Sequence, residues 1–497
     1  MLRSLFQKLK GVLYKLNLIK GAMQTSQVVH YSDSQEKHAA RIEKWKCLYA
    51  GHLKEIHTVK IPTSSNPNKT RKMLTLNIPK LVSNKLARLI FNEKCEISYS
   101  DIKYGERIDE LLNKHHFDRE FQKHLEYGLA LGGLVAKVYA DDGELKYTFV
   151  NADSFVITDW DQYGITGAVF LDQTYKNGEY YTLFESHQLN RRKRAYTVSN
   201  RLYKSKTSNE IGVEVPLNEI YSDLERDITF NKVDKPFFAY FKPNTANNID
   251  LNSPFGISVY ANAIDACKAT DEAFDSFNRE IRLGKKRIIA PVQALKTSTD
   301  INGDTTQYFD VEDEVFVFMK LGLDAEGEQI KDVTSELRIQ EHIDAVNAGL
   351  QHISMLVGLS PGTFTFTATG LKTATEVISE NDETFKTKQS HEIMVEEFIK
   401  DLIHAIITLG GIVEPQTFTK PPQDFSVTIT FDDSIAESKE TKLNNIVTQV
   451  TNGFMSKLEA IMELRGLEEK EAVQVLEQIQ KENRTITPDM TEMMGGE

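Results

Sequence analysis

The sequence predicts an α+β fold of about two to four subdomains, and three observations indicate it. Apolar residues recur with helical spacing over long stretches, most clearly in residues 254–284 and 337–358. The spacing changes to two between residues 134 and 203, where Asp141-Asp142-Gly143 and Asn177-Gly178 mark turns of an antiparallel meander. The chain has 497 residues, 40 % hydrophobic and 26 % charged, which is globular composition.

A basic amphipathic segment opens the chain, ahead of the helices and the meander. In residues 1–25, leucines line one face of the expected helix and lysines another, so we expect the helix to dock on a partner protein. Binding to a membrane surface is the alternative. Residues 26–253 should then form helices followed by the meander, and Pro79 suits the first turn of one helix.

The middle of the chain reads as two rod-like helices that hold an insert. The first, residues 254–284, stops at Gly284. Residues 285–336 should then form two or three strands, with a turn at Asn302-Gly303. In the second, residues 337–358, apolar residues alternate in steps of four and three, a narrow seam typical of coiled coils. Such a seam can pack in the chain's own core or on an adjacent subunit, and we predict that subunit packing stabilises it. The seam consists of Ile339, Ile343, Val346, Leu350, Ile353 and Val357.

A loop rich in glycine, threonine and phenylalanine follows the second rod. Residues 359–371 have no helical period, and two phenylalanines would be costly to leave in water without a partner. We expect them to be exposed and to touch passing DNA or a neighbouring loop. The residues concerned are Thr363, Phe364, Thr365, Phe366, Thr367 and the nearby Lys372. Residues 372–432 should then form a long helix and, at 425–431, a strand. Residues 433–497 should form helices and a tail, with capping boxes at Ser434 with Glu437 and at Ser456 with Glu459.

The charges and motifs exclude some functions and leave others open. A net charge of −13 argues against tight nucleic-acid binding, which relies on phosphate neutralisation. One basic cluster has three possible roles: its cations could stabilise a helix C-terminus, form salt bridges between subunits or contact DNA phosphates. Its members are Arg279, Arg282, Lys285, Lys286 and Arg287.

No catalytic motif is present, so we predict no enzyme, no cofactor and no metal. His115-His116 and the Asp159/Asp161 pair have structural explanations, because adjacent helical residues converge poorly on one ion and turn carboxylates bond to backbone. Two alternatives stay open. One is an enzyme of unrecognised class with the meander as its pocket, and the other is a peripheral membrane or capsid assembly protein that uses residues 1–25.

Several short sequence segments, in their order along the chain, resemble segments of one protein family. They are Pro254-Phe255-Gly256-Ile257-Ser258, Phe277-Asn278-Arg279-Glu280-Ile281, Leu359-Ser360-Pro361-Gly362-Thr363-Phe364 and Thr373-Ala374-Thr375-Glu376-Val377. In their order and spacing the sequence resembles the portal proteins of tailed bacteriophages. These segments are most similar to those of the branch found in long-tailed phages of Gram-positive hosts.

The resemblance implies a phage portal fold and a ring of about twelve identical subunits at one capsid vertex. Double-stranded DNA would pass through the ring, driven by a separate motor, the packaging terminase large subunit. Other implied partners are a head–tail connector or adaptor protein and the major capsid and scaffolding proteins. The implied location is the virion, with the host cytoplasm during assembly, and no membrane is expected.

The same resemblance assigns a role to each part of the chain. Residues 26–253 would be the wing, 254–284 and 337–358 the two stem helices, and 285–336 the clip. Residues 359–371 would be the tunnel loop. The long helix and a wing strand would occupy 372–432, and a helical crown with a tail would occupy 433–497.

Overall fold

The computed structural model divides into two compact units, which are described separately. The first comprises residues 1–368 and 386–431, and the second residues 369–385 and 432–497. Within them the structure describes residues 33–61, 66–92, 95–141, 143–208, 210–284, 288–291, 296–299, 301, 303, 305–308, 316–319, 331–332, 336–365, 374–418, 425–431, 439–465 and 469–486. The basic helix expected at residues 1–25 lies outside the described residues.

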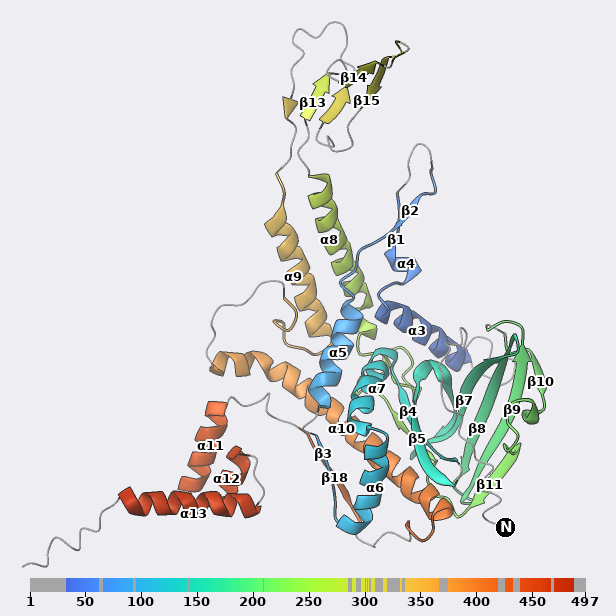
Figure 1. The fold of residues 1–497 in the computed structure, drawn as a ribbon, viewed down its shortest axis with the longest axis vertical. Coiled ribbons are helices and arrows are strands. Elements are labelled where there is room, and N and C mark those ends of the chain that lie inside the picture. Colours follow the sequence, from blue (N-terminus) through green and yellow to red (C-terminus); the bar gives the residue numbers. More distant parts are fainter. Residues whose placement is uncertain are drawn as a thin grey trace, which may run out of the picture. The chain divides into compact units, whose positions relative to one another are not determined.

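Helices precede the sheets of the first unit, and one of them, α7 (Phe117–Leu131), packs on β4 (Leu134–Asp141) and β5 (Glu144–Asn151) (Figure 1). The others are α3 (Asp33–Tyr49), α4 (Lys54–His57), α5 (Ile78–Ile90) and α6 (Ile102–Lys114). Pro79 lies in the first turn of α5, as expected, because the missing amide hydrogen of proline costs nothing there. The chain leaves α7 at Gly132, whose φ of 82° favours glycine.

Two antiparallel sheets confirm the expected change to a period of two. In the smaller, the expected hairpin joins β4 (Leu134–Asp141) to β5 (Glu144–Asn151), and β12 (Phe238–Phe241) pairs with β4. In the larger, the strands run in the order β10-β9-β8-β7-β6, and β11 also pairs with β9. These strands are β6 (Phe155–Asp161), β7 (Gly164–Lys176), β8 (Glu179–Asn190), β9 (Ala195–Ser205), β10 (Val213–Val215) and β11 (Asp227–Asn231). Short 3₁₀ turns follow β5 (Ala152–Ser154) and β10 (Leu217–Glu219).

The two rods are α8 (Ile264–Leu283) and α9 (Ile339–Leu356), which lie side by side and antiparallel (Figure 1). α8 ends at Gly284 as expected, but it begins ten residues later than the expected start at 254. Residues 254–260 form irregular buried chain, and a 3₁₀ turn (Ala261–Ala263) precedes α8. A Cβ on Gly256 would come within 2.3 Å of the Gly132 carbonyl oxygen, and the Tyr260 hydroxyl donates to the Trp45 carbonyl at 2.8 Å. Apolar residues here are therefore spaced by core packing rather than by a helix.

The insert between the rods forms more strands than expected. β13 (Ile288–Pro291) lies between β16 (Phe316–Met319), to which it is parallel, and β17 (Lys331–Asp332), to which it is antiparallel. β14 (Lys296–Thr299) and β15 (Thr305–Tyr308) form a separate hairpin around the expected turn at Gly303.

Segments far apart in the chain close the first unit. β18 (Val427–Thr430), within the expected strand at 425–431, pairs with β3 (Glu96–Tyr99). A further hairpin joins β1 (Thr58–Lys60) to β2 (Thr70–Lys72). α10 (Ala374–Val413) contributes residues 386–413 to this unit, including the buried Phe398, Leu402 and Ile406.

The second unit contains residues 374–385 of α10 and three further helices, α11 (Lys439–Thr451), α12 (Lys457–Arg465) and α13 (Glu469–Ile486). The capping box expected at the start of α12 is present. Glu459 N donates to Ser456 Oγ at 3.1 Å, and Ser456 N donates to Glu459 Oε2 at 2.8 Å. The other expected box, at Ser434, lies outside the described residues.

Candidate functional site

The rods α8 and α9 are joined at the end that carries the insert. Glu280 accepts a hydrogen bond from Arg338 N at 2.9 Å and from Arg338 Nη2 at 2.7 Å. His342 Nε2 lies 2.7 Å from the same carboxylate. The hydrogen bonds from Arg338, and then that from His342, lower the pKa of Glu280 to about 2. Farther along, a Cβ on Gly349 would come within 2.3 Å of Thr270 Oγ1, so the rods approach closely there.

The seam of α9 packs mainly inside the chain, which corrects our expectation that subunit packing stabilises it. Val346, Leu350, Ile353 and Val357 are at most 7 % exposed and belong to the core of the first unit. Apolar side chains at this spacing fill the space between the rods and the rest of the core, so they offer no free surface to a neighbour. At the insert end, Ile339 is 45 % exposed and Ile343 is half-buried.

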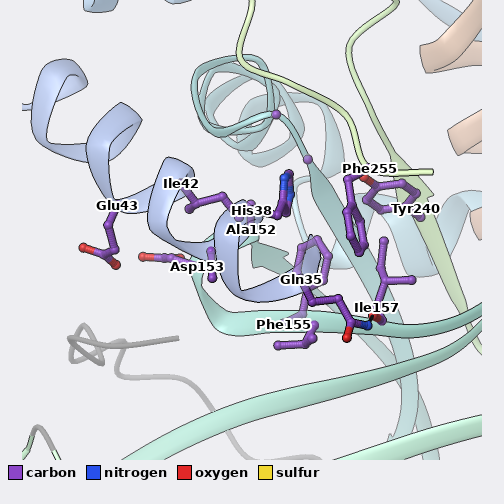
Figure 2. Close-up of a pocket in the computed structure, with 14 residues that line it drawn as sticks. Gln35, His38, Ile42, Glu43, Ala152, Asp153, Phe155, Ile157, Tyr240 and Phe255 are labelled. Atoms are coloured by element: carbon purple, nitrogen blue, oxygen red, sulfur yellow. Dashed lines mark hydrogen bonds between the residues drawn. The ribbon is translucent and has the colours of Figure 1, made fainter. Parts of the chain in front are cut away.

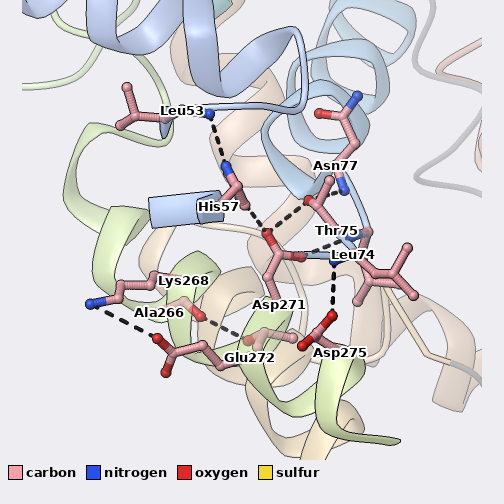
Figure 3. A network of polar contacts seen from close by, with 12 residues as sticks. Leu53, His57, Leu74, Thr75, Asn77, Ala266, Lys268, Asp271, Glu272 and Asp275 are labelled. Carbon is pink, nitrogen blue, oxygen red and sulfur yellow. Dashed lines mark hydrogen bonds and ion pairs between the residues drawn. The ribbon is translucent and has the colours of Figure 1, made fainter. Parts of the chain in front are cut away.

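Two aspartates one turn apart on α8 hold an extended strip of chain, residues 71–76, against the rod (Figure 3). Asp275 accepts hydrogen bonds from Arg71 Nη1 and Nη2. It also accepts one from Leu74 N at 3.0 Å. The hydrogen bond from Arg71 is the main cause that lowers the pKa of Asp275. Asp271 is 2 % exposed and accepts from Thr75 Oγ1 and Leu76 N, each at 2.8 Å. We call these contacts the aspartate clamp.

His57 also belongs to the aspartate clamp, and its two ring contacts fix which nitrogen carries the proton. Leu53 N donates to His57 Nδ1 at 2.8 Å, so this nitrogen carries no proton. The proton therefore sits on Nε2, which lies 3.2 Å from Asp271 Oδ2 and donates to it. Sequence reasoning missed this cluster. The available signal was a pair of acids at i and i+4 in a helix, of which Asp271 falls between Cys267 and Phe274 in the apolar spacing.

The loop after α9 is anchored where it leaves the helix. Gly358 has a φ of 74°, and its carbonyl accepts from Thr387 Oγ1 at 2.5 Å. The Thr363 hydroxyl donates to the Ser360 carbonyl at 2.7 Å. Phe364, which we expected to be exposed, is half-buried and packs against the core, because the turn at 360–363 directs it back onto the unit. Thr365 is exposed, and the expected residues Phe366, Thr367 and Lys372 lie outside the described residues.

Part of the basic cluster lies on the free face of α8. Arg279 and Arg282 are both exposed near the C-terminus of that helix. The remaining members, Lys285, Lys286 and Arg287, lie outside the described residues.

One enclosed cavity of the first unit is too small for an ordinary substrate. It has about 40 Å³ and lies between α3, the 3₁₀ turn after β5 and the Phe255 ring (Figure 2). His38 stacks on Phe255 with ring centroids 4.5 Å apart. Burial lowers the pKa of His38 to about 4, so the ring is neutral at pH 7. The cavity has room for a few water molecules rather than for a metabolite.

Two polar motifs singled out in the sequence lie at a turn and at a helix junction. Asp161 accepts from the backbone amide of Tyr163 at 2.8 Å, the turn contact expected of it, and from Arg191 Nε at 2.8 Å. His115 and His116 lie at the junction of α6 and α7. Among described residues, no three or more histidines, cysteines or acids gather where a metal ion would bind. Within the same residues, no helix is long and apolar enough to cross a membrane.

Comparison with known proteins gives one result that covers nearly the whole chain. Residues 29–489 match the model of a family described as "Phage portal protein, SPP1 Gp6-like". No curated protein matches the sequence. Phage portal proteins are structural and non-enzymatic, which argues against the enzyme alternative, and they are multimeric components of the virion capsid. With its rods, insert and helical second unit inside the matched range, this chain belongs to the phage portal protein family.

Proposed function

We propose that this chain forms a closed ring at one vertex of the capsid, and that genome DNA passes through the ring during packaging and ejection. The observation that carries the proposal is the order of parts along one axis. Two antiparallel rods, α8 and α9, have a strand insert at one end and the loop from residue 359 at the other. Such an arrangement suits a wall element around a channel, with separate contact points at its two ends.

On this proposal residues 26–253 are the wing, α8 and α9 the stem, and residues 285–336 the clip. Residues 359–371 are the tunnel loop, and the helices of 433–497 are the crown. The paired strands of the clip are few and short, so they suit packing against other subunits or against a docked protein rather than an independent core. We therefore assign attachment of the packaging motor and the head–tail connector to the clip.

The charge of the chain supports a conduit that does not grip its cargo. Tight DNA binding requires many cations at phosphates, and affinity falls by about 0.9 log units per contact for each log unit of salt. A chain with net charge −13 supplies few such contacts when repeated around a ring. DNA in its channel would stay centred and free to move.

Electron microscopy of the purified full chain in negative stain tests the ring directly. The expected image is a ring with a central hole, and monomers or filaments at every concentration would refute the proposal. Deletion of residues 297–305, which removes most of the β14–β15 hairpin, tests the clip. Rings should persist while heads fail to fill with DNA, whereas a Gly/Ser replacement of 300–304 alone should be tolerated. Normal filling after the deletion would contradict the clip assignment.

A further inference from the structure

The outer faces of the two rods carry opposite charges at the same end. α8 exposes Arg279 and Arg282 in its last two turns, and α9 exposes Glu341 and Asp344 in its first two turns. Because the rods run antiparallel and Glu280 binds Arg338, these turns lie level with one another (Figure 1). A basic and an acidic surface therefore lie at the same level of the rod pair on one chain.

Helical spacing directs both surfaces away from the contact between the rods. Thr270 and Gly349 mark that contact. At about 100° per residue, Arg279 and Arg282 lie about 180° and 120° around α8 from Thr270. Asp344 lies about 140° around α9 from Gly349, and Glu341 about 80°. Three of the four charges thus point away from the contact between the rods, and Glu341 stands at its edge.

Within the described part of the chain, none of these four charges has an ion-pair partner. Asp344 accepts a hydrogen bond from Gln340 at 2.9 Å. Arg279 helps to lower the pKa of Asp275, and Glu341 helps to raise the pKa of Arg338, in both cases without an ion pair. By contrast, Lys268 on the same α8 face pairs with Glu272 at 3.9 Å. The unpaired charges concentrate at the insert end of the rods.

The spacing of the charges suits a second copy of the same helix pair. Both the arginines and the acids are three residues apart, so antiparallel helices align Arg279 with Asp344 when Arg282 meets Glu341. With Thr270 level with Gly349, each pair is offset along the axis by about four residues, roughly 6 Å, which an arginine side chain can span. Two ion pairs can therefore form together without a change in either helix.

We propose that, in the assembled ring, α8 of one subunit lies beside α9 of the next and pairs Arg279 with Asp344 and Arg282 with Glu341. This inference rests on the ring of the proposed function and adds the surfaces that meet. Because the complementary faces lie on different helices, the contact is head-to-tail, the type that closes into rings. It replaces the apolar seam of α9, which is buried in the core, as the stem interface.

Charge reversal and its rescue in the full chain test this pairing. We would compare the wild type with Arg279→Glu/Arg282→Glu, with Glu341→Arg/Asp344→Arg, and with the variant that combines all four substitutions. Lys268→Glu is the matched control, because it reverses a charge on the same face where α9 offers no acid at that level. Mass photometry over a range of protein and salt concentrations would give the midpoint of ring assembly, and thermal unfolding would verify the fold of each variant.

Each double variant should raise the midpoint concentration of assembly by at least about tenfold at low salt, and the fourfold variant should return it close to the wild type. The midpoint concentration of the wild type should rise with salt. The midpoint of the Lys268→Glu control should stay close to that of the wild type at each salt concentration. Folded double variants that assemble normally, or a fourfold variant that is not rescued, would overturn the pairing while the wild-type ring preserves the proposed function. DNA binding by the arginines would show as impaired packaging with normal rings and no rescue, which also overturns it. A wild type that forms no rings would overturn both.

Discussion

Removal of the Asp271 carboxylate should detach the strip 71–76 from the first rod. The carboxylate accepts from Leu76 N at 2.8 Å, Thr75 Oγ1 at 2.8 Å and His57 Nε2 at 3.2 Å while only 2 % exposed. Asp271→Ala leaves these three donors without an acceptor. Each donor that water does not reach should lower the free energy of unfolding by about 1–3 kcal/mol. Leu76 and Thr75 are only partly buried, so we expect a total nearer to 3–5 kcal/mol.

Hydrogen exchange measured by mass spectrometry reports this loss locally, without requiring two-state unfolding of a large protein. Since about 1.4 kcal/mol corresponds to a tenfold change, amides of residues 71–76 should exchange roughly a hundredfold faster or more. Asp271→Asn keeps one acceptor oxygen and should fall between. Asp265→Ala, at an exposed position in the first turn of α8, is the control. Less than a tenfold change in Asp271→Ala would show that the clamp does not hold the strip.

Three further predictions concern other parts of the chain. Leu350→Ala should destabilise the monomer by about 2–5 kcal/mol, measured by chemical unfolding, because Leu350 is 5 % exposed in the core; a loss confined to ring assembly would contradict this. Burial lowers the pKa of His391 to about 4 from a normal 6.5, so the stability it contributes is complete above pH 6.5 and is lost as the pH falls toward 4. His391→Gln, which can still accept from Asn244 N, should flatten this dependence in thermal unfolding, and an unchanged pH profile would count against it. Ser456→Ala should cost the start of α12 about 1 kcal/mol, seen as about fivefold faster exchange of its first-turn amides, and unchanged exchange would refute the cap.

Patterns that depend on neighbours in sequence could be predicted well. The hairpin at Asp141-Asp142-Gly143, the end of α8 at Gly284 and the capping box at Ser456 follow from local turn and cap chemistry. The period of two correctly separated the sheets from the helices. These features need no knowledge of what packs against them.

Features that depend on distant partners could not be predicted. Residues 254–260 have helix-like apolar spacing, yet the approach of Gly256 to Gly132 forces irregular chain. The seam of α9 looks the same whether the chain's own core or a neighbour covers it, and Leu350 is covered by the core. The partners of Asp271 lie about 200 residues away, so its role was not visible in the sequence.

The pairing of β3 with β18 has a consequence for how the chain folds. Ser426 N donates to Ser100 Oγ, a contact between residues 326 positions apart. During synthesis, β3 therefore stays unpaired until both rods and all of α10 have been made. Open strand edges and long-range pairings slow folding and favour aggregation. Chains that terminate before residue 427 should consequently aggregate rather than accumulate as competitors for ring assembly.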